Sequence, residues 1–224
     1  QIAAEGAHEI RTPVGALMGH CQVALYQPRS TEEYETLLAN NMEELERISR
    51  MVENILFLAR ATDARSVLTI TSIDVSAEMT RIQEYFEGLA EEREMTLHSA
   101  GEGILYADAI LFQRALSNLV ANAVRYAHEG TPIVVRAEAH ASGMDIHVIS
   151  QGDPIPPEKL GKLFDRFYRA DASRSEGGSS SGLGLSIVQA IMALHQGSVR
   201  VVSSAEGETR FTLTFPREDH KFSQ

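Results

Sequence analysis

A histidine near the start of the chain has neighbours that could make it a nucleophile. The run reads His8-Glu9-Ile10-Arg11-Thr12-Pro13, inside a stretch that we predict to be helical. On a helical wheel, His8 points away from the apolar stripe, and Thr12 lies one turn further along the same face. An exposed imidazole beside the carboxylate of Glu9 could act as a nucleophile whose proton is removed locally. The alternative is an ordinary solvated surface histidine.

Two asparagines and an arginine share one face of a second predicted helix, over residues 109–127. Asn118, Asn122 and Arg125 are separated by four and three residues, away from the apolar stripe of that helix. A carboxamide oxygen can ligate Mg²⁺ without placing a full negative charge beside phosphates, and an arginine can pair with a phosphate oxygen. The alternative is an ordinary polar helix face.

A run rich in glycine and serine, residues 177–185, precedes a third predicted helix over residues 184–195. Glycines allow backbone N–H groups to approach phosphates at a helix N-terminus. The run is not a P-loop, because Leu183 stands where the lysine is required. It is not a dinucleotide fingerprint either, because Ile187 replaces the third glycine. It could contact a nucleotide or be a flexible linker.

Two phenylalanines with arginines beside them follow the proline-rich turn at residues 152–157. Phe164 and Phe167 are three residues apart, and Arg166 and Arg169 flank the second of them. The aromatic rings could dock a mobile lid on the domain while an arginine reaches a phosphate. Plain packing is the alternative interpretation.

The hydrophobic pattern predicts the elements that would position these residues. Two long helices come first, at residues 2–26 and 31–61, with Ser30 as the N-cap of the second. The remainder mixes helices at 75–93, 109–127 and 184–195 with strands near 67–71, 95–99, 104–106, 133–140, 144–150, 198–204 and 209–215. Helices beside a mostly antiparallel sheet form an α+β layer.

The second helix has the apolar spacing of a helix bundle, with steps of three and four residues. Its series is Leu38, Asn41, Leu45, Ile48, Val52, Ile55 and Ala59, and the first helix has a looser stripe at Val14, Leu17, Cys21 and Ala24. Because two helices cannot bury both stripes alone, we expect a four-helix bundle formed by a dimer. The alternative is that the hairpin packs on the rest of its own chain.

Composition excludes several classes of protein. The 224 residues include 20 Lys and Arg against 31 Asp and Glu, a net charge of −11 that argues against nucleic acid or an anionic membrane as the main partner. The single cysteine, Cys21, excludes a disulfide framework and suits a reducing cytoplasm. No apolar run approaches the length of a membrane span. Because the chain starts at Gln1, close to His8, we expect a fragment whose sensor and membrane anchors lie upstream.

The order of the four motifs resembles that in the cytoplasmic kinase core of two-component sensor histidine kinases. Residues 8–13 look like the H-box, 118–123 like the N-box, 164–167 like the F-box and 182–185 like the second glycine box. The stretch GDPIPPEKL, followed by LFDRFYRAD, is most similar to the heavy-metal (copper-type) sensor kinases.

The resemblance implies a fold and a division into domains. A helical hairpin forms a dimeric four-helix bundle and is followed by an α/β sandwich of Bergerat (histidine kinase ATPase) type. The expected divisions are residues 1–62 for the dimerisation and phosphotransfer hairpin, 63–72 for a linker, 73–217 for the ATP-binding domain and 218–224 for a tail. The implied location is the cytoplasmic portion of an inner-membrane sensor.

The resemblance also implies an ATP-dependent protein-histidine kinase. His8 would be the phosphoacceptor, Glu9 would assist its deprotonation, and Thr12 would orient a water in the reverse, phosphatase reaction. Asn122 would hold Mg²⁺, and ATP would contact Asn118, Asn122, Arg125, Tyr126, Ser150, Gly152, Ile155, Phe164, Phe167, Arg169, Gly182, Leu183, Gly184 and Leu185. The phosphoryl group would then pass to an aspartate on the receiver domain of a response regulator. No nucleic acid or membrane contact is expected for this fragment.

One box departs from the family pattern. Ser150 stands where most members have an aspartate that accepts from the adenine amino group, and Pro154 replaces a glycine. A neutral acceptor is roughly half as strong as a charged one, so we expect weaker discrimination for adenine. This departure motivates an alternative, a phosphatase-biased or non-catalytic dimeric scaffold with weak ATP binding. An ATPase of the chaperone or topoisomerase type is a third possibility, but it would have no need of the H-box.

Overall fold

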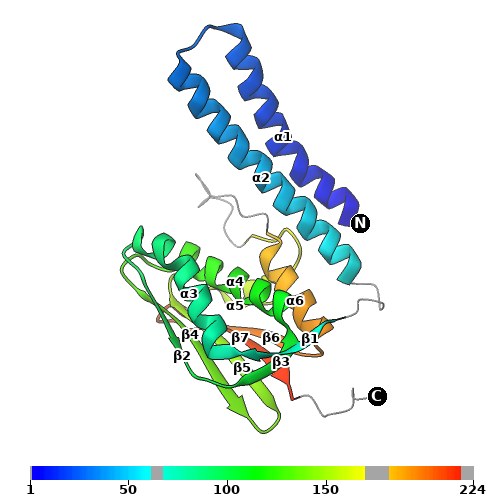
Figure 1. Ribbon diagram of the computed structural model, residues 1–224, viewed down its shortest axis with the longest axis vertical. Helices are drawn as coiled ribbons and strands as arrows, with labels where there is room; N and C mark the ends of the chain where they lie inside the picture. The colour runs from blue at the N-terminus through cyan, green and yellow to red at the C-terminus, as the bar shows by residue number, and fades with distance from the viewer. Residues whose placement is uncertain (1, 62–67, 170–181, 218–224) are drawn as a thin grey trace.

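The computed structural model describes residues 2–61, 68–169 and 182–217, with side chains described from Ile10 onward (Figure 1). A long helical hairpin projects from an α/β domain, and the lower end of its second helix lies beside that domain. The hairpin consists of α1 (Ile2–Tyr26) and α2 (Thr31–Ala61). Ser30 caps α2 as predicted, because its hydroxyl accepts from the N–H of Glu33 while the Glu33 carboxylate accepts from the N–H of Ser30.

The two hairpin helices leave much of their apolar surface open. Asn41 of α2 is buried against α1, whereas Leu38 and Leu45 of the predicted seam are 59% and 56% exposed. On α1, Ala24 is buried while Val14 remains 38% exposed. Within a single hairpin, α1 therefore covers the side of the α2 stripe that contains Asn41, whereas the side that contains Leu38 and Leu45 stays exposed.

The α/β domain contains a five-stranded sheet and a separate two-stranded one. The large sheet has the order β2-β4-β5-β7-β6, in which only the β2–β4 pair is parallel, and β1 pairs with β3. The bounds are β1 Ile70–Asp74, α3 Val75–Glu91, β2 Thr96–Ala100, β3 Ile104–Asp108, α4 Ala109–Tyr126, β4 Pro132–His140, β5 Gly143–Gln151, α5 Pro157–Leu160, α6 Gly184–Leu194, β6 Ser198–Ser203 and β7 Glu208–Pro216.

The core lies between the large sheet and the helices α3, α4 and α6, which cover one of its faces (Figure 1). Phe112 of α4 is fully buried and meets Phe215 of β7 edge to face, with ring centroids 5.7 Å apart. Every second residue of β4 from Ile133 to Ala137 is buried, as expected for a sheet covered on one face. The predicted hairpin followed by a two-layer α/β domain is confirmed.

The first strand begins later than predicted. We placed it at residues 67–71, whereas β1 runs Ile70–Asp74, because Ile70 pairs with Asp108 and Asp74 with Ile104. Residues 70–72 therefore belong to a sheet rather than to the linker expected over 63–72. The rest of that linker up to residue 67, and the expected tail at 218–224, lie outside the described residues. The short helix α5 was not predicted.

The lower part of α2 packs on the α/β domain. Met51 and Leu58 are 2% and 1% exposed and belong to the same apolar cluster as the domain core. Ile55 and Phe57 are partly buried against that cluster. The alternative that the hairpin packs on its own chain thus holds for the lower part of α2, while the exposed upper stripe still needs another partner.

Candidate functional site

One cavity gathers residues from most of the predicted motifs. It is bounded by the end of α4, the end of β5, the loop leading to α5, the start of α6, and β7. Its lining residues are Asn122, Ala123, Tyr126, Ser150, Gly152, Asp153, Pro154, Ile155, Pro156, Lys159, Leu163, Tyr168, Arg169, Gly182, Gly184, Leu185, Thr209 and Phe211.

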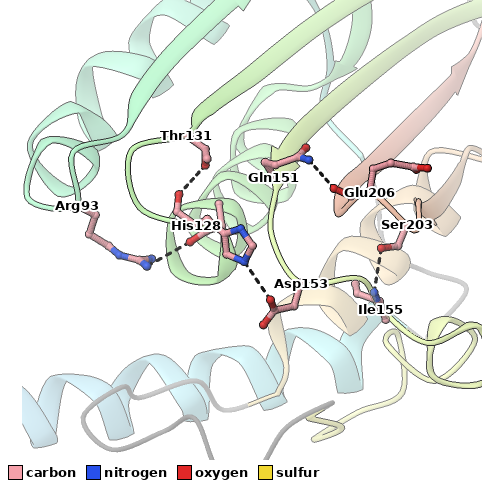
Figure 2. Close-up of polar contacts among 9 residues, drawn as sticks. Arg93, His128, Thr131, Gln151, Asp153, Ile155, Ser203 and Glu206 are labelled. Carbon is pink, nitrogen blue, oxygen red and sulfur yellow. Dashed lines mark hydrogen bonds and ion pairs between the residues drawn. The ribbon is translucent and has the colours of Figure 1, made fainter.

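The end of α4 is held by an arginine from outside that helix. The guanidinium of Arg93 donates to the carbonyl oxygens of Val124, Arg125 and Ala127, the last two at 2.9 and 3.2 Å. Figure 2 shows this side chain reaching across to the turn that contains His128. A cation at a helix C-terminus satisfies carbonyls that have no partner inside the helix. Arg93 therefore fixes the last turn of α4, where Tyr126 lines the cavity.

The back wall is a close contact between the end of α4 and the end of β5. The N–H of His128 donates to the carbonyl of Gln151 at 2.7 Å, and Ala127 forms an isolated bridge with Gly152. A Cβ at Gly152 would lie 2.8 Å from the carbonyl oxygen of Tyr126. Only glycine allows the two backbones to approach this closely.

A hydroxyl chain anchors the loop after β5 to the neighbouring strands. Figure 2 shows the N–H of Ile155 directed at Ser203 Oγ, a hydrogen bond of 3.0 Å. Ser203 Oγ lies 3.1 Å from Thr209 Oγ1, and Thr209 pairs directly with Ser150 across β5 and β7. Ser150 and Thr209 thus place two hydroxyl groups side by side in the cavity lining.

A histidine and an aspartate meet beside the cavity. His128 Nε2 is 3.0 Å from Asp153 Oδ1, with side-chain exposures of 53% and 50% (Figure 2). Thr131 Oγ1 donates to the carbonyl of His128, which holds the turn that carries the imidazole. The pair links the turn after α4 to the loop that lines the cavity.

The N-terminus of α6 faces the same cavity. Gly182 has φ +65°, Leu183 occupies the N-cap position, and no side chain of the described residues caps the helix. A Cβ at Gly184 would lie 3.0 Å from Asn118 Oδ1, so the glycine lets α4 and α6 pack closely. Uncapped N–H groups and the positive end of a helix dipole form a ready site for an anion such as phosphate.

The donor set fits a nucleotide with a magnesium ion. The cavity has an apolar wall suited to a planar ring, formed by Ala123, Ile155, Leu163 and Phe211. Lys159 and Arg169 add positive charge to the same cavity, which the start of α6 also lines. Asn122 supplies a carboxamide beside that end. Among the described residues no group of three or more His, Cys, Asp or Glu converges to hold a metal. A carboxamide oxygen such as that of Asn122 suits Mg²⁺, which in nucleotide sites also binds phosphate oxygens.

The structure brings together nine of the residues predicted for ATP binding, namely Asn122, Tyr126, Ser150, Gly152, Ile155, Arg169, Gly182, Gly184 and Leu185. The other five, Asn118, Arg125, Phe164, Phe167 and Leu183, do not line the cavity. Phe164 packs edge to face on Phe211, Leu183 is fully buried, and Arg125 is exposed at the end of α4. These residues support the site from behind or lie beside it.

The predicted H-box lies on α1. Thr12 is exposed, as a helix surface residue should be. His8 and Glu9 fall within the helix, but their side chains lie outside the described part of the structure. Whether the imidazole of His8 is exposed, as predicted, therefore stays a prediction.

Sequence reasoning missed several lining residues. Lys159, Leu163 and Tyr168 lie within the stretches GDPIPPEKL and LFDRFYRAD, but none of them was predicted to bind the nucleotide, and Lys159 lies on α5, which was not predicted. Thr209 and Phe211 were assigned only to a strand. Their place in the site depends on the pairing of β5 with β7, which spacing along the chain does not reveal.

Comparison with known families identifies both parts of the chain. Residues 107–219 match the family described as histidine kinase-, DNA gyrase B-, and HSP90-like ATPase, and residues 1–64 match the His Kinase A (phospho-acceptor) domain. A phosphoacceptor hairpin joined to an ATPase domain of this type defines a class of signalling kinase. This chain belongs to the sensor histidine kinases.

Curated relatives agree with this assignment. The chain is 44% identical over 216 residues to the sensor protein CzcS of Cupriavidus metallidurans, and 43% identical over 216 residues to the sensor histidine kinase CusS of Escherichia coli K12. These alignments cover 96% of this chain and 45% of each relative, so the chain spans less than half of their length. The predicted family, including its likeness to the heavy-metal sensor kinases, is confirmed.

Solved structures share the fold. The Acinetobacter baumannii histidine kinase AdeS superimposes with a TM-score of 0.79 at 22% identity, covering 95% of this chain and 98% of that one. Histidine kinase ThkA, solved in complex with the response regulator protein TrrA, has a TM-score of 0.77 at 23% identity over 98% of this chain and 62% of that one. None of the described helices combines the length and apolar character needed to cross a bilayer.

Proposed function

We propose that this chain is the kinase core of a sensor histidine kinase. It transfers the γ-phosphoryl group of ATP to His8 and then to an aspartate on the receiver domain of a response regulator. The observation that carries the proposal is a cavity that Asn122 shares with the N-terminus of α6, which no described side chain caps, in a chain that also carries the H-box. Such a cavity suits phosphates, and the H-box offers a nucleophile to receive one.

Different residues of the cavity bind the base and the phosphates of the nucleotide. The apolar wall and the hydroxyls of Ser150 and Thr209 receive the base, while Lys159 and Arg169 pair with phosphate oxygens. Asn122 would ligate Mg²⁺, which when bound supplies positive charge that neutralises the phosphate oxygens. Positioning and charge neutralisation account for most of the catalysis of phosphoryl transfer.

The H-box supplies the acceptor. The imidazole of His8 attacks the γ-phosphorus, the bond to the β,γ-bridging oxygen breaks, and ADP leaves. Glu9 takes up the proton of the imidazole, which keeps His8 nucleophilic. Thr12, exposed on the same helix, orients a water when the phosphorylated regulator is hydrolysed.

The hairpin dimerises with a second copy of the chain. Leu38 and Leu45 are more than half exposed, and together with Val52 and Leu56 they form an apolar stripe along α2. Pairing two such hairpins into a four-helix bundle removes this surface from water. We propose that the chain is the cytoplasmic portion of an inner-membrane sensor. It covers 45% of the sensor protein CzcS, to which it is similar.

Incubation with labelled ATP and Mg²⁺ tests the proposal. We expect phosphate that is labile in acid and stable in base, as a phosphohistidine is, and none in His8→Gln at unchanged ATP affinity. His20→Gln, which changes an exposed histidine further along α1, is the matched control and should label like the wild type. Full labelling of His8→Gln on another residue would contradict the assignment.

A second candidate is a phosphatase-biased or non-catalytic dimeric scaffold, which the neutral Ser150 in place of an aspartate favours. It predicts little bound ATP and no label on His8. A phosphatase-biased chain would still dephosphorylate a phosphorylated receiver domain, whereas an inert scaffold would not. The labelling experiment and a direct ATP titration separate both from the kinase.

A further inference from the structure

An arginine of the α/β domain contacts the second helix of the hairpin. Arg114 projects from α4 to α2, where its Nη2 donates to Asn54 Oδ1 at 2.7 Å. Its guanidinium also lies over the ring of Phe57, with Cζ 4.5 Å from the ring centroid. One side chain of the domain thus makes two different directional contacts with the same turn of α2.

The contact is more than an exposed ion pair. Burial lowers the pKa of Arg114 below its usual value, and the nearby carboxylate of Glu53 opposes that shift. The guanidinium nevertheless stays charged at physiological pH, because arginine starts from so high a pKa. A charge removed from water gains more from an aromatic face and an amide oxygen than an exposed one does. By contrast, Arg50 of α2 is 65% exposed and lies 3.8 Å from Glu46.

The pairing of α1 with α2 shows which residue of α1 lies level with the Arg114 contact. Asn41 Nδ2 donates to Cys21 Sγ at 3.5 Å, and Tyr34 Oη donates to the carbonyl of Ala24 higher up. The helices are antiparallel, so equal steps down α1 and α2 stay level because each residue rises by the same amount. His8 lies thirteen residues before Cys21 and Asn54 lies thirteen after Asn41. Arg114 therefore contacts α2 at the level of His8, the proposed phosphoacceptor.

The same arginine is tied to the nucleotide cavity through α4. The carbonyl of Arg114 accepts from Asn118 Nδ2 at 2.8 Å, one turn further along the helix. Asn118 Oδ1 packs on Gly184 at the start of α6, and Asn122 enters the cavity after another turn. Because α4 is a helix with a buried face, its contact with α2, together with the packing of α6 on α2, sets where the cavity lies relative to the hairpin.

We propose that Arg114 is an interdomain positioning residue whose contacts with Asn54 and Phe57 hold the nucleotide cavity at the level of His8 for phosphoryl transfer. This inference rests on the proposed function, since it needs His8 to accept the phosphoryl group. Arg114 does not line the cavity. Its effect should therefore fall on the rate of transfer and not on the binding of ATP.

The test compares rate with affinity in this chain. In Arg114→Met, which keeps the length of the side chain and loses its charge, we expect autophosphorylation at saturating ATP to slow by about 10- to 100-fold, the scale of a small misplacement of reacting groups. The ATP dissociation constant should stay within about twofold, because the cavity itself is unchanged. Arg81→Met, which changes an arginine 67% exposed on α3, is the control and should keep the wild-type rate.

The hairpin side of the contact gives an independent test. Asn54→Ala should slow transfer as well, and Arg114→Met with Asn54→Ala should be no slower than the slower single variant, because both remove one interaction. Asn54→Asp, which places a carboxylate against the guanidinium, should retain the rate. If Asn54→Ala labels His8 at the wild-type rate or faster, or changes ATP affinity as much as rate, the inference is wrong. A wild-type chain that never labels His8 would instead overturn the proposed function.

Discussion

Phe167 meets Gly182, a residue of the cavity lining, backbone to backbone. The N–H of Phe167 donates to the carbonyl of Gly182 at 3.0 Å, and both residues have left-handed backbones, with φ of 62° and 65°. A Cβ at Gly182 would lie 2.7 Å from the carbonyl carbon of Phe167. The F-box and the second glycine box are therefore joined by a contact that only glycine permits.

Gly182→Ala should weaken the site. A left-handed backbone costs an alanine about 1–2 kcal/mol, and the contact with Phe167 adds a clash. We expect a lower unfolding temperature and weaker ATP binding, measured by calorimetry on the same sample. The control is Gly161→Ala, because Gly161 has φ −66° and a Cβ there would meet nothing within 4 Å. Equal ATP affinity in the two variants would mean that the contact does not shape the cavity.

The local part of this site could be predicted from the sequence. The glycines of residues 182–185 indicated that phosphates could approach backbone N–H groups at a helix N-terminus. The structure places Gly182 and Gly184 in the cavity lining. The left-handed backbone of Phe167 could not be predicted, because such a conformation is rare for a bulky residue and depends on its partner across the contact.

Asn41→Leu should stabilise the hairpin and make its assembly less specific. Asn41 is 8% exposed, its Oδ1 has no hydrogen-bond partner among the described residues, and its Nδ2 donates to the Cys21 sulfur at 3.5 Å. Relieving a buried, unsatisfied amide is expected to raise the free energy of unfolding by about 1–3 kcal/mol. A polar residue in a helix seam restricts register and oligomer state, so its loss should allow species larger than a dimer.

Thermal unfolding and sedimentation measure both effects for Asn41→Leu. Asn40→Leu, one residue earlier on the exposed side of α2, serves as the control. A less stable Asn41→Leu variant would indicate that the amide is fully bonded in the dimer.

The sequence predicted the apolar stripe of α2 but not which side of that stripe faces α1. The spacing predicted one apolar stripe containing Leu38, Asn41 and Leu45, and all three lie on it. Only the structure distinguishes the side that faces α1, with Asn41 buried, from the side left open, with Leu38 and Leu45 exposed. The contact between Arg114 and Asn54 of α2 likewise could not be predicted from residue spacing, because the two residues are sixty positions apart in the sequence.

Thr12→Ala should separate the two activities of the H-box. Thr12 is exposed on α1, and in the proposed mechanism Glu9, not Thr12, takes the proton from His8. Removing its hydroxyl should slow dephosphorylation of a receiver domain by about tenfold or more, the scale of losing one group that orients a reactant. Autophosphorylation from ATP should stay within about twofold, because the nucleotide cavity is untouched.

Both rates are measured on Thr12→Ala with the same labelled receiver domain. Thr36→Ala is the control, since Thr36 lies near the far end of the hairpin and its hydroxyl bonds only to the carbonyl of Glu32. An equal loss of both rates in Thr12→Ala would contradict the division of roles.

Ser150→Asp should tighten the binding of ATP. Ser150 lines the cavity and lies directly opposite Thr209 on β7, so two neutral hydroxyls lie there. We aligned Ser150 with the aspartate that, in most of the family, accepts from the adenine amino group. A serine hydroxyl can rotate to accept from an amino group or donate to a carbonyl, so the wild type should prefer ATP over GTP only modestly. A carboxylate can only accept, and it would repel the carbonyl that guanine presents at that position.

We therefore expect Ser150→Asp to gain no more than about 1–3 kcal/mol in ATP binding, the scale of one charged hydrogen bond, and to bind GTP no better than the wild type. Calorimetric titration of ATP and GTP into both proteins measures the two differences. Ser142→Asp adds the same charge at the exposed β4–β5 turn and should leave both affinities unchanged. Weaker ATP binding by Ser150→Asp would mean that the cavity is organised around the serine hydroxyl and its neighbour Thr209. In that case the base is read by a different group, and Ser150 does not occupy the position of the family's adenine-binding aspartate.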